Sequence, residues 1–233
     1  MDEDELRALI ETQYQLVYTE LDLGGCVIKA CYAQNLDELF DELVSKGENH
    51  PDVEDERIPY WADLWPASIG LARYLMAENQ VAIQGAKVLE LGAGLGLAGL
   101  AAHLQGGKVT VTDYEPAALH LAQYFWLINE QIPFDAQVMD WRQPNPELMA
   151  DVVIAADVAY EERFYPDLLR CFQTVLRPGG RIIISEPNRK IGRSWLLSLV
   201  EDGKAQLLKE EKVDLQGLET PVGIFEVFAD RLS

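Results

Sequence analysis

The sequence predicts an α/β fold in which seven strands form a doubly wound, mostly parallel sheet that ends with an antiparallel pair of strands. Short apolar runs alternate with stretches of helical periodicity from residue 61 onward, the pattern of a parallel sheet with helices on both faces. Two strand-like runs close the chain with no long helix between them, so they must pair as an antiparallel hairpin. A chain of 233 residues is long enough to bury one such core.

The first part of the chain is predicted to be an α/β extension over residues 1–58, followed by a larger domain over residues 59–233. The extension should contain a short helix, a hairpin, a second helix and an acidic loop, over residues 3–13, 14–32, 36–46 and 51–59. Asp22, Gly24 and Gly25 belong to the turn between the two β-rich runs of the hairpin. Asn35 is expected to cap the second helix.

The larger domain is predicted to alternate strands and helices. Its strands are expected at residues 87–90, 109–113, 136–139, 152–156, 181–185, 206–213 and 223–229. Its helices are expected at residues 67–79, 95–104, 117–129, 165–176 and 194–201. Pro116 favours the start of the third helix, and Pro178-Gly179-Gly180 predicts a type II turn before the fifth strand.

Composition and charge exclude several classes of protein. Hydrophobic residues make up 48% of the chain and charged residues 25%, which is typical of an ordered globular protein. No apolar run reaches the roughly 18 residues of a membrane helix, and the acidic start over residues 1–5 is the reverse of a cationic signal peptide. We therefore expect a cytoplasmic protein that does not bind membranes.

The formal net charge of −20 bears on possible partners. A field that negative repels a phosphate backbone, so nucleic acid is not expected as a substrate. The acidic segments 2–5 and 52–57 could attract a lysine-bearing partner, although solvated acidic surface explains them more simply. The three cysteines form no C-x-x-C pair and the three histidines lack metal-ligand spacing, so no metal is expected.

A glycine-rich turn follows the first strand of the larger domain, in Glu90-Leu91-Gly92-Ala93-Gly94-Leu95-Gly96. Glycines can adopt positive φ and let a ligand approach the backbone, and the helix that follows offers unpaired N–H groups. Asp113 comes 19 residues after Gly94, where a Rossmann-like fold places the carboxylate that binds ribose hydroxyls. Gly96 arrives one position too early for the dinucleotide pattern G-x-G-x-x-G. These residues predict a nucleoside cofactor site that does not take NAD.

Polar and aromatic residues follow the next two strands at the same edge of the predicted sheet, where ligands bind in open α/β folds. Tyr114 comes directly after Asp113 and is expected near an adenine ring. Asp140 and Trp141 follow the third strand and suit the adenine amine and ring face. These residues complete a predicted cofactor pocket.

The fourth and fifth strands end in residues suited to a second ligand. Asp157 and Tyr160 follow the fourth strand, and Glu186 with Asn188 follows the fifth. Asp157 and Tyr160 could instead cap the helix that follows them. The basic residues at 189, 190 and 193 are interpreted as a solvated loop that could also contact an acidic partner.

Two motifs resemble known methyltransferases. Glu90-x-Gly92-x-Gly94-x-Gly96 resembles motif I of the seven-strand S-adenosylmethionine (SAM) methyltransferases. Asp157-x-x-Tyr160, with the stretch over residues 60–67, resembles the D-x-x-Y group of methyltransferase family 16, whose members methylate protein lysines. The two prolines found at this motif in methyltransferases of nucleic-acid bases are missing. The resemblance spans about residues 60–185, and the extension carries no diagnostic family motif.

The resemblance implies a cofactor, a reaction and a set of site residues. SAM is the expected cofactor and S-adenosylhomocysteine the product. Trp65 and Trp141 match family tryptophans beside the cofactor, although tryptophans at 61 and 65 could be packing residues. The expected cofactor contacts are Trp65, Glu90, Gly92, Ala93, Gly94, Asp113, Tyr114, Asp140, Trp141 and Ala156. The expected acceptor contacts are Trp61, Tyr160, Glu186 and Asn188, with Asp157 and Tyr160 as catalytic residues.

The sequence thus predicts methyl transfer from SAM to an acceptor amine, with a lysine side chain of another protein as the expected acceptor. Two alternatives stay open at this stage. One is a small-molecule N- or O-methyltransferase. The other is a non-catalytic module that binds SAM, although the glycines of motif I and Asp113 are all present.

Overall fold

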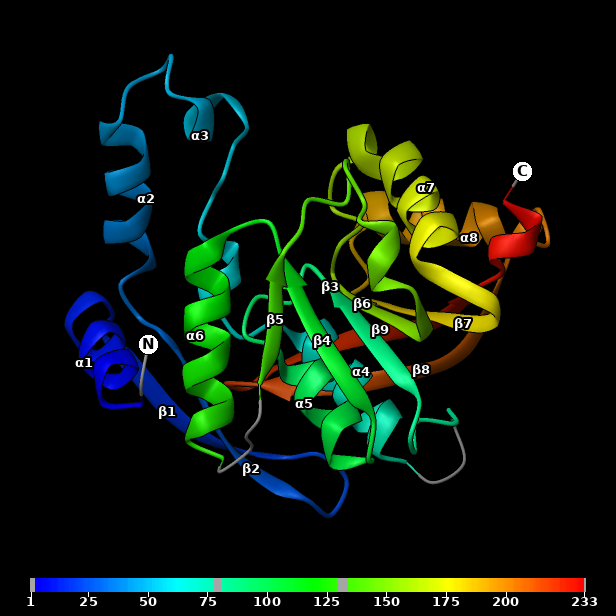
Figure 1. Ribbon diagram of the computed structural model, residues 1–233, viewed down its shortest axis with the longest axis horizontal. Coiled ribbons are helices and arrows are strands. Elements are labelled where there is room, and N and C mark those ends of the chain that lie inside the picture. The colour runs from blue at the N-terminus through cyan, green and yellow to red at the C-terminus, as the bar shows by residue number, and fades with distance from the viewer. Residues whose placement is uncertain (1–2, 78–80, 130–133, 233) are drawn as a thin grey trace.

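The computed structural model describes residues 3–77, 81–129 and 134–232, and a seven-stranded sheet lies at its centre (Figure 1). The strands are β3 Lys87–Leu91, β4 Lys108–Asp113, β5 Asp135–Val138, β6 Ala150–Ala156, β7 Leu176–Glu186, β8 Ala205–Leu215 and β9 Leu218–Val227. Their order across the sheet is β5–β4–β3–β6–β7–β9–β8. The first five pair in parallel, and β9 is antiparallel to both of its neighbours. The predicted fold class is confirmed.

The chain changes direction across the sheet between β3 and β6. From β3 it moves outward through β4 to β5, and it then returns to add β6 and β7 on the other side of β3. The arrowheads of β3, β4 and β5 point to the same edge in Figure 1. Ligands of open α/β sheets bind outside the carboxyl ends of the strands at such a switch. The loops that follow Leu91, Asp113 and Ala156 are therefore the place to look for a site.

Helices cover both faces of the sheet. One face carries α4 Pro66–Met76, α5 Leu97–Leu104 and α6 Pro116–Leu127, and the other carries α7 Tyr165–Val175 and α8 Lys190–Glu201. Ile154 of β6 packs with the first group, whereas its neighbours Val153 and Ala155 pack with the second. This alternation is expected because successive side chains of a strand point to opposite faces. Short 3-10 helices occur at Tyr60–Ala62, Pro146–Leu148, Glu162–Phe164 and Ala229–Arg231.

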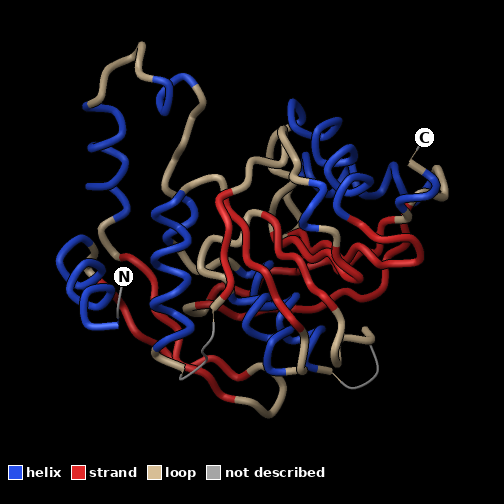
Figure 2. The backbone as a smooth tube through the Cα atoms, viewed as in Figure 1, coloured by secondary structure: helices blue, strands red, loops and turns tan. Residues whose placement is uncertain are grey.

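The N-terminal extension packs on the face that carries α6. Its elements are α1 Glu3–Gln13, the antiparallel hairpin of β1 Leu16–Asp22 and β2 Val27–Ala33, α2 Leu36–Ser45 and α3 Pro51–Glu54. Leu6, Ile10 and Ile28 are buried in the same hydrophobic cluster as Phe125 of α6. In Figures 1 and 2, α1 and the hairpin lie beside α6, while α2 and α3 project away from the sheet. The extension therefore shares its core with the larger domain.

Several helix ends differ from those expected. Helix α5 begins at Leu97 rather than at residue 95, because Gly96 has a φ of +69° and cannot be part of a right-handed helix. Helix α8 begins four residues earlier than predicted, at Lys190. Asn35 occupies the N-cap position of α2, as predicted, but its side chain makes no capping hydrogen bond and instead accepts the N–H of Gln15, at 3.0 Å. Helix α4 ends at Met76, and residues 78–79 of the predicted helix lie outside the described residues.

The C-terminal strands are longer than predicted. Strand β9 begins five residues early, because Gln216 and Gly217, at φ +55° and +81°, form a two-residue turn that keeps Leu215 paired with Leu218. The turn expected before the fifth strand is a bulge inside β7. Gly179 has the positive φ, +77°, that a type II turn needs, but pairing with β6 continues on both sides of it.

None of the helices formed by the described residues is both long and apolar enough to cross a bilayer. Within the same ranges, no group of three or more His, Cys, Asp or Glu side chains is placed to hold a metal ion.

Candidate active site

A cavity of about 410 Å³ lies at the carboxyl ends of β3, β4 and β6, where the sheet changes direction. Its size is within the range of roughly 300–1,000 Å³ found for small-molecule sites. Most of the predicted site residues line it: Trp61, Trp65, Gly92, Ala93, Gly94, Asp113, Tyr114, Trp141, Ala156, Asp157 and Tyr160. Glu90, Asp140, Glu186 and Asn188 do not line it.

The glycine loop lines the cavity and is packed closely against its neighbours. Gly92 and Gly94 have φ values of +58° and +53°. A Cβ on Gly92 would lie 2.9 Å from the ring of Trp141, and one on Gly94 would lie 3.2 Å from the carbonyl oxygen of Trp61. A larger residue would meet the Trp141 ring at position 92 and the backbone of Trp61 at position 94. The two glycines therefore keep backbone open to a ligand.

Asp113 fixes the glycine loop and also faces the cavity. Its Oδ2 accepts the N–H of Gly94 and its Oδ1 accepts the N–H of Glu115, both at 3.0 Å. Burial raises the pKa of this carboxyl to about 6, although the backbone amides oppose the shift. An ionised carboxylate has about four acceptor sites, so Asp113 can also accept hydrogen bonds from ligand hydroxyls.

Glu90 lies beneath the glycine loop rather than in the cavity, contrary to its predicted contact with the cofactor. Only 2% of it is exposed. Its Oε2 accepts the N–H of Gly99 at 3.0 Å, and a Cβ on Gly99 would collide with that oxygen. Burial raises the pKa of Glu90 to about 8. Glu90 thus links β3 to α5 through its hydrogen bond with Gly99.

Aromatic side chains form the wall opposite the glycine loop. The indole N–H of Trp65 donates to the carbonyl of Tyr60 at 2.7 Å, and the two rings meet edge to face at 5.9 Å. The ring of Tyr60 also meets that of Tyr160, at 6.4 Å. Burial raises the pKa of Tyr160, so its hydroxyl keeps its proton. This wall brings together residues from before α4 and from the loop after β6.

Asp157 stands at the end of β6 in a backbone conformation that is unusual for a residue with a side chain. Its φ is +54°, and its N–H donates to the carbonyl of Ser185 on β7 at 2.9 Å. The guanidinium of Arg189 donates to both carboxylate oxygens, at 2.8 and 3.1 Å. Burial raises the pKa of Asp157, and Arg189 opposes that shift.

Arg189 was not among the predicted site residues; it lies in an exposed loop, as interpreted from the sequence, and it also contributes to the cavity. It lines the cavity and its guanidinium lies over the ring of Trp65, 5.2 Å from the ring centroid. Asp157 and Arg189 are 32 positions apart in the sequence. No local pattern marks such a pair, so only the fold reveals it.

Glu186 and Asn188 shape the turn that carries Arg189, and neither is placed to touch an acceptor in the cavity as predicted. Only 1% of Glu186 is exposed, and its carboxylate accepts the N–H groups of Asn188 and Arg189, at 2.8 and 2.5 Å. Asn188 adopts a φ of +62°. Gly192, near the start of α8, packs closely against the loop after β6, because a Cβ there would lie 2.6 Å from the carbonyl oxygen of Ala159.

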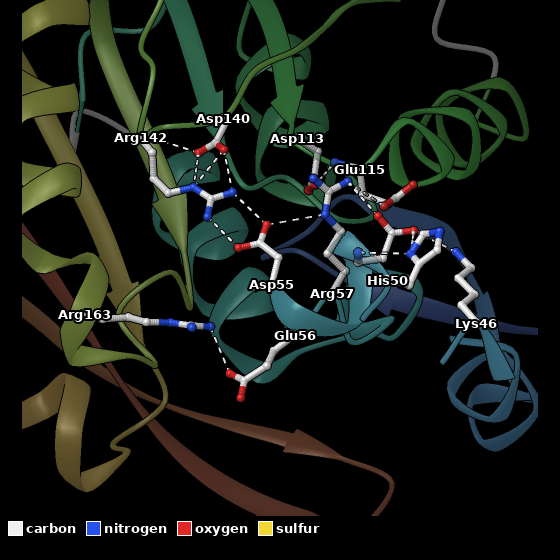
Figure 3. Close-up of polar contacts among 11 residues, drawn as sticks. Lys46, His50, Asp55, Glu56, Arg57, Asp113, Glu115, Asp140, Arg142 and Arg163 are labelled. Atoms are coloured by element: carbon white, nitrogen blue, oxygen red, sulfur yellow. Dashed lines mark hydrogen bonds and ion pairs between the residues drawn. The ribbon is translucent and has the colours of Figure 1, made fainter. Parts of the chain in front are cut away.

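The end of the extension closes one side of the cavity. Figure 3 shows Asp55 between Arg142 and Arg57. Arg142 donates to both oxygens of Asp55, at 2.6 and 2.8 Å, and it also binds Asp140, at 2.7 Å. Both oxygens of Asp140 accept N–H groups of Arg142, from its backbone as well as its guanidinium, and Asp140 does not line the cavity, so its predicted contact with an adenine amine stays a prediction. Arg57 lies over the ring of Tyr114, 5.1 Å from the centroid.

Three further acidic residues of the cavity wall, Glu56, Asp63 and Glu161, were not predicted. Glu56 lines the cavity and pairs with Arg163 at 2.9 Å, a contact drawn in Figure 3. Asp63 also lines it, and burial raises the pKa of its carboxyl. Asp63 lies within the 60–67 stretch that supported the family resemblance, so this motif was the signal that could have identified it.

Comparison with known proteins matches this region to one family. A sequence model of the family described as lysine methyltransferase matches residues 54–202, which include every residue of the cavity wall named above. The chain is 36% identical to Protein N-lysine methyltransferase METTL21A of Xenopus tropicalis, over 53% of this chain and 59% of the relative. It is 28% identical to the Electron transfer flavoprotein beta subunit lysine methyltransferase of Homo sapiens, over 70% of this chain and 63% of the relative. The chain thus spans less than two thirds of the length of these relatives.

Solved structures share the fold. RsmC of T. thermophilus, a 16S rRNA N2 G1207 methyltransferase in complex with AdoMet and guanosine, superimposes with a TM-score of 0.59 at 16% identity, over 91% of this chain and 50% of that one. The magnesium protoporphyrin IX methyltransferase ChlM of Synechocystis PCC 6803, solved with bound SAM, gives a TM-score of 0.54 at 14% identity, over 82% and 90% of the two chains. At these identities the likeness shows a common fold.

Proposed function

Because this chain belongs to the lysine methyltransferase family, we propose that it is a SAM-dependent enzyme that transfers a methyl group to a lysine side chain of another protein. The observation that carries the proposal is the composition of the cavity. A glycine loop with positive φ, a buried carboxylate and an aromatic wall meet at the carboxyl ends of β3, β4 and β6.

The residues of the cavity fit SAM in each of its parts. Asp113 is suited to the ribose hydroxyls, and the rings of Tyr114 and Trp141 are suited to the adenine. The backbone of Gly92 and Gly94 can approach the methionine part, and the Asp63 carboxylate can pair with its ammonium group. Bound SAM would supply a methyl group on a positively charged sulfur, which leaves as a neutral thioether.

The acceptor side of the cavity is formed by Asp157 and Tyr160 with Trp61 and Trp65. These groups would hold the acceptor amine beside the methyl group and exclude water from it. Correct placement alone can lower the barrier of such a displacement by about 7–11 kcal/mol. The amine must first lose its proton, because an exposed lysine has a pKa of about 10.4 and only the neutral amine has a free electron pair.

The acceptor, location and domain division complete the proposal. A net charge of −20 favours a lysine-bearing protein over nucleic acid. We place the enzyme in the cytoplasm. Residues 59–233 form the methyltransferase domain and residues 1–58 an extension that contributes to acceptor choice. The contact of Glu56 and Ile58 with the cavity supports this division of roles.

The test is methyl transfer from SAM that carries a labelled methyl group. The protein is incubated with a protein extract from its source cells and, separately, with the small-molecule fraction of that extract. Mass spectrometry then locates the label. Label on lysine in a protein is expected with the wild-type chain and not with Asp157→Ala. Label found only in the small-molecule fraction would show that the acceptor is a small molecule rather than a protein. No label, together with no binding of SAM, would refute the proposed methyltransferase activity.

A further inference from the structure

The carboxylate of Asp157 is already paired with a cation of the same chain. Two N–H groups of Arg189 donate to its two oxygens, at 2.8 and 3.1 Å. Only 10% of the Asp157 side chain is exposed, against 45% of that of Arg189. The acceptor side of the cavity therefore presents an ion pair rather than a bare negative charge.

Arg189 is held in this position from two sides. Its backbone N–H donates to the buried carboxylate of Glu186, which fixes the turn before α8. Its guanidinium lies over the ring of Trp65, a contact that attracts a cation to the face of an indole. Trp65 in turn is fixed by the hydrogen bond of its indole N–H to Tyr60. A guanidinium fixed in this way gives a carboxylate a defined partner and a defined orientation.

We propose that Arg189 is a positioning residue of the acceptor site, which neutralises Asp157 and so allows the site to bind the acceptor amine without its proton. This inference rests on the proposed function. An unpaired carboxylate would attract the acceptor ammonium and raise its pKa, which opposes the reaction. A cation beside the acceptor has the opposite effect and lowers that pKa. The proton that the acceptor ammonium gives up passes to water.

The paired carboxylate can still bind the neutral amine. Arg189 uses two of about four acceptor sites on the Asp157 oxygens, so an amine N–H can donate to one of the others. Glu186 at the end of β7 and Tyr160 in the same loop interact electrostatically with Asp157. The other titratable side chains that line the cavity, besides Asp157, Tyr160 and Arg189, are Glu56, Tyr60, Asp63, Asp113, Tyr114 and Glu161. Burial raises the pKa of Asp113 to about 6 and that of Glu186 to about 7, so both carry a negative charge over most of the range above pH 7, in the wild-type protein and in Arg189 variants alike.

The first experiment needs no acceptor. Protein labelled with ¹³C at the aspartate side-chain carboxyls is titrated by NMR, and the signal of Asp157 is assigned by its loss in Asp157→Asn. Arg189→Gln should raise the pKa of Asp157 by about 1–3, the effect of removing a contacting opposite charge from a carboxyl. Arg189→Lys should raise it less. Lys190→Gln removes the same charge from an exposed neighbour and should leave it unchanged. An unchanged Asp157 pKa in Arg189→Gln would overturn the inference.

The second experiment uses the protein labelled in the transfer assay as the acceptor. The rate of transfer is measured from pH 6 to pH 10 with saturating SAM. In Arg189→Gln the midpoint of the rise in rate should move to higher pH. Below the midpoint, transfer should slow about tenfold for each whole pH step by which the midpoint moves, and it should recover at high pH. Affinity for S-adenosylhomocysteine should stay within a few-fold. A loss of equal size at every pH would assign Arg189 a structural role and overturn the inference. Absence of transfer by the wild-type protein would instead overturn the proposed function.

Discussion

Glu90 is a buried carboxyl that should make the stability of this protein depend on pH. Burial beneath the glycine loop raises its pKa from the ordinary 4.5 to about 8, although the amides of Gly99 and Ala98 oppose the shift. Between these two values the folded state binds more protons than the unfolded state, so the free energy of unfolding falls as pH rises. Glu90→Gln removes this titration and keeps a side-chain oxygen that can accept the N–H of Gly99.

The size of the effect follows from the two pKa values. A difference of one in pKa is worth about 1.36 kcal/mol, and integration from pH 5 to pH 8 gives a loss of about 3.5 kcal/mol in the free energy of unfolding of the wild-type protein. Burying the glutamine side chain of Glu90→Gln also changes the free energy of unfolding, but this change is the same at every pH because the amide does not titrate. The difference between Glu90→Gln and the wild type should therefore move by about 3.5 kcal/mol in favour of the variant over this range.

Urea unfolding at pH 5, 6, 7 and 8, extrapolated linearly to water, measures this difference. Glu201→Gln, at an exposed position on α8, controls for the loss of a carboxyl as such. We expect the curves of stability against pH to diverge for Glu90→Gln and to remain parallel for the control. Parallel curves for Glu90→Gln would mean that Glu90 is already ionised at pH 5 in the folded protein, and the reasoning from burial would be refuted.

Substitutions around the cavity should separate cofactor binding from transfer. Asp113→Ala should weaken SAM binding about 10- to 150-fold in calorimetry, from the loss of about 1.5–3 kcal/mol of hydrogen bonding to a charged group. Since burial raises the Asp113 pKa to about 6, wild-type SAM affinity should also fall below pH 6, and a flat profile would contradict the assigned contact. Asp157→Ala should abolish transfer and keep SAM affinity within a few-fold, whereas loss of folding would make Asp157 a structural residue. Asp55→Asn should cost less than about 1 kcal/mol of stability, because its pair with Arg142 is partly exposed, yet speed S-adenosylhomocysteine release in stopped-flow. An unchanged release rate would show that the end of the extension, which Asp55 ties to Arg142, does not keep the cofactor in the cavity.

The central strands could be predicted because strands buried on both faces are marked in the sequence by short runs of apolar residues. Ala150–Ala156 is almost wholly apolar, and Lys87–Leu91 has three apolar residues, as expected for strands covered on both faces. The start of β9 was missed for the opposite reason. Its first four residues are exposed or half-buried, and only the part from Val222 onward is buried. Pairing with β8 extends the hairpin beyond the core, where apolar pattern no longer marks a strand.

The cofactor side of the cavity was predictable because its parts are close in sequence. The glycines of motif I follow one strand directly, and Asp113 ends the next. The ion pairs around the cavity could not be predicted in this way. Asp157 and Arg189 lie 32 positions apart, and Asp55 and Arg142 lie 87 apart. Each pair depends on loop conformations, such as the positive φ values of Asp157 and Asn188, that the residue types alone do not require.

Four carboxyl side chains near strand ends, all predicted as site residues, turn out to have different surroundings. Asp113 and Asp157 line the cavity, and Asp113 also accepts the backbone N–H groups of Gly94 and Glu115. Glu90 and Glu186 do not line the cavity and accept backbone N–H groups of the segments that follow them. A carboxyl at the end of a strand can line a cavity, accept backbone N–H groups, or do both. In this chain the two glutamates, Glu90 and Glu186, accept backbone N–H groups without lining the cavity. Glu186 thereby fixes Arg189, and Arg189 fixes Asp157. Glu186, which was predicted from the sequence to contact the acceptor, is thus linked to Asp157 through Arg189 and makes no contact of its own with the cavity.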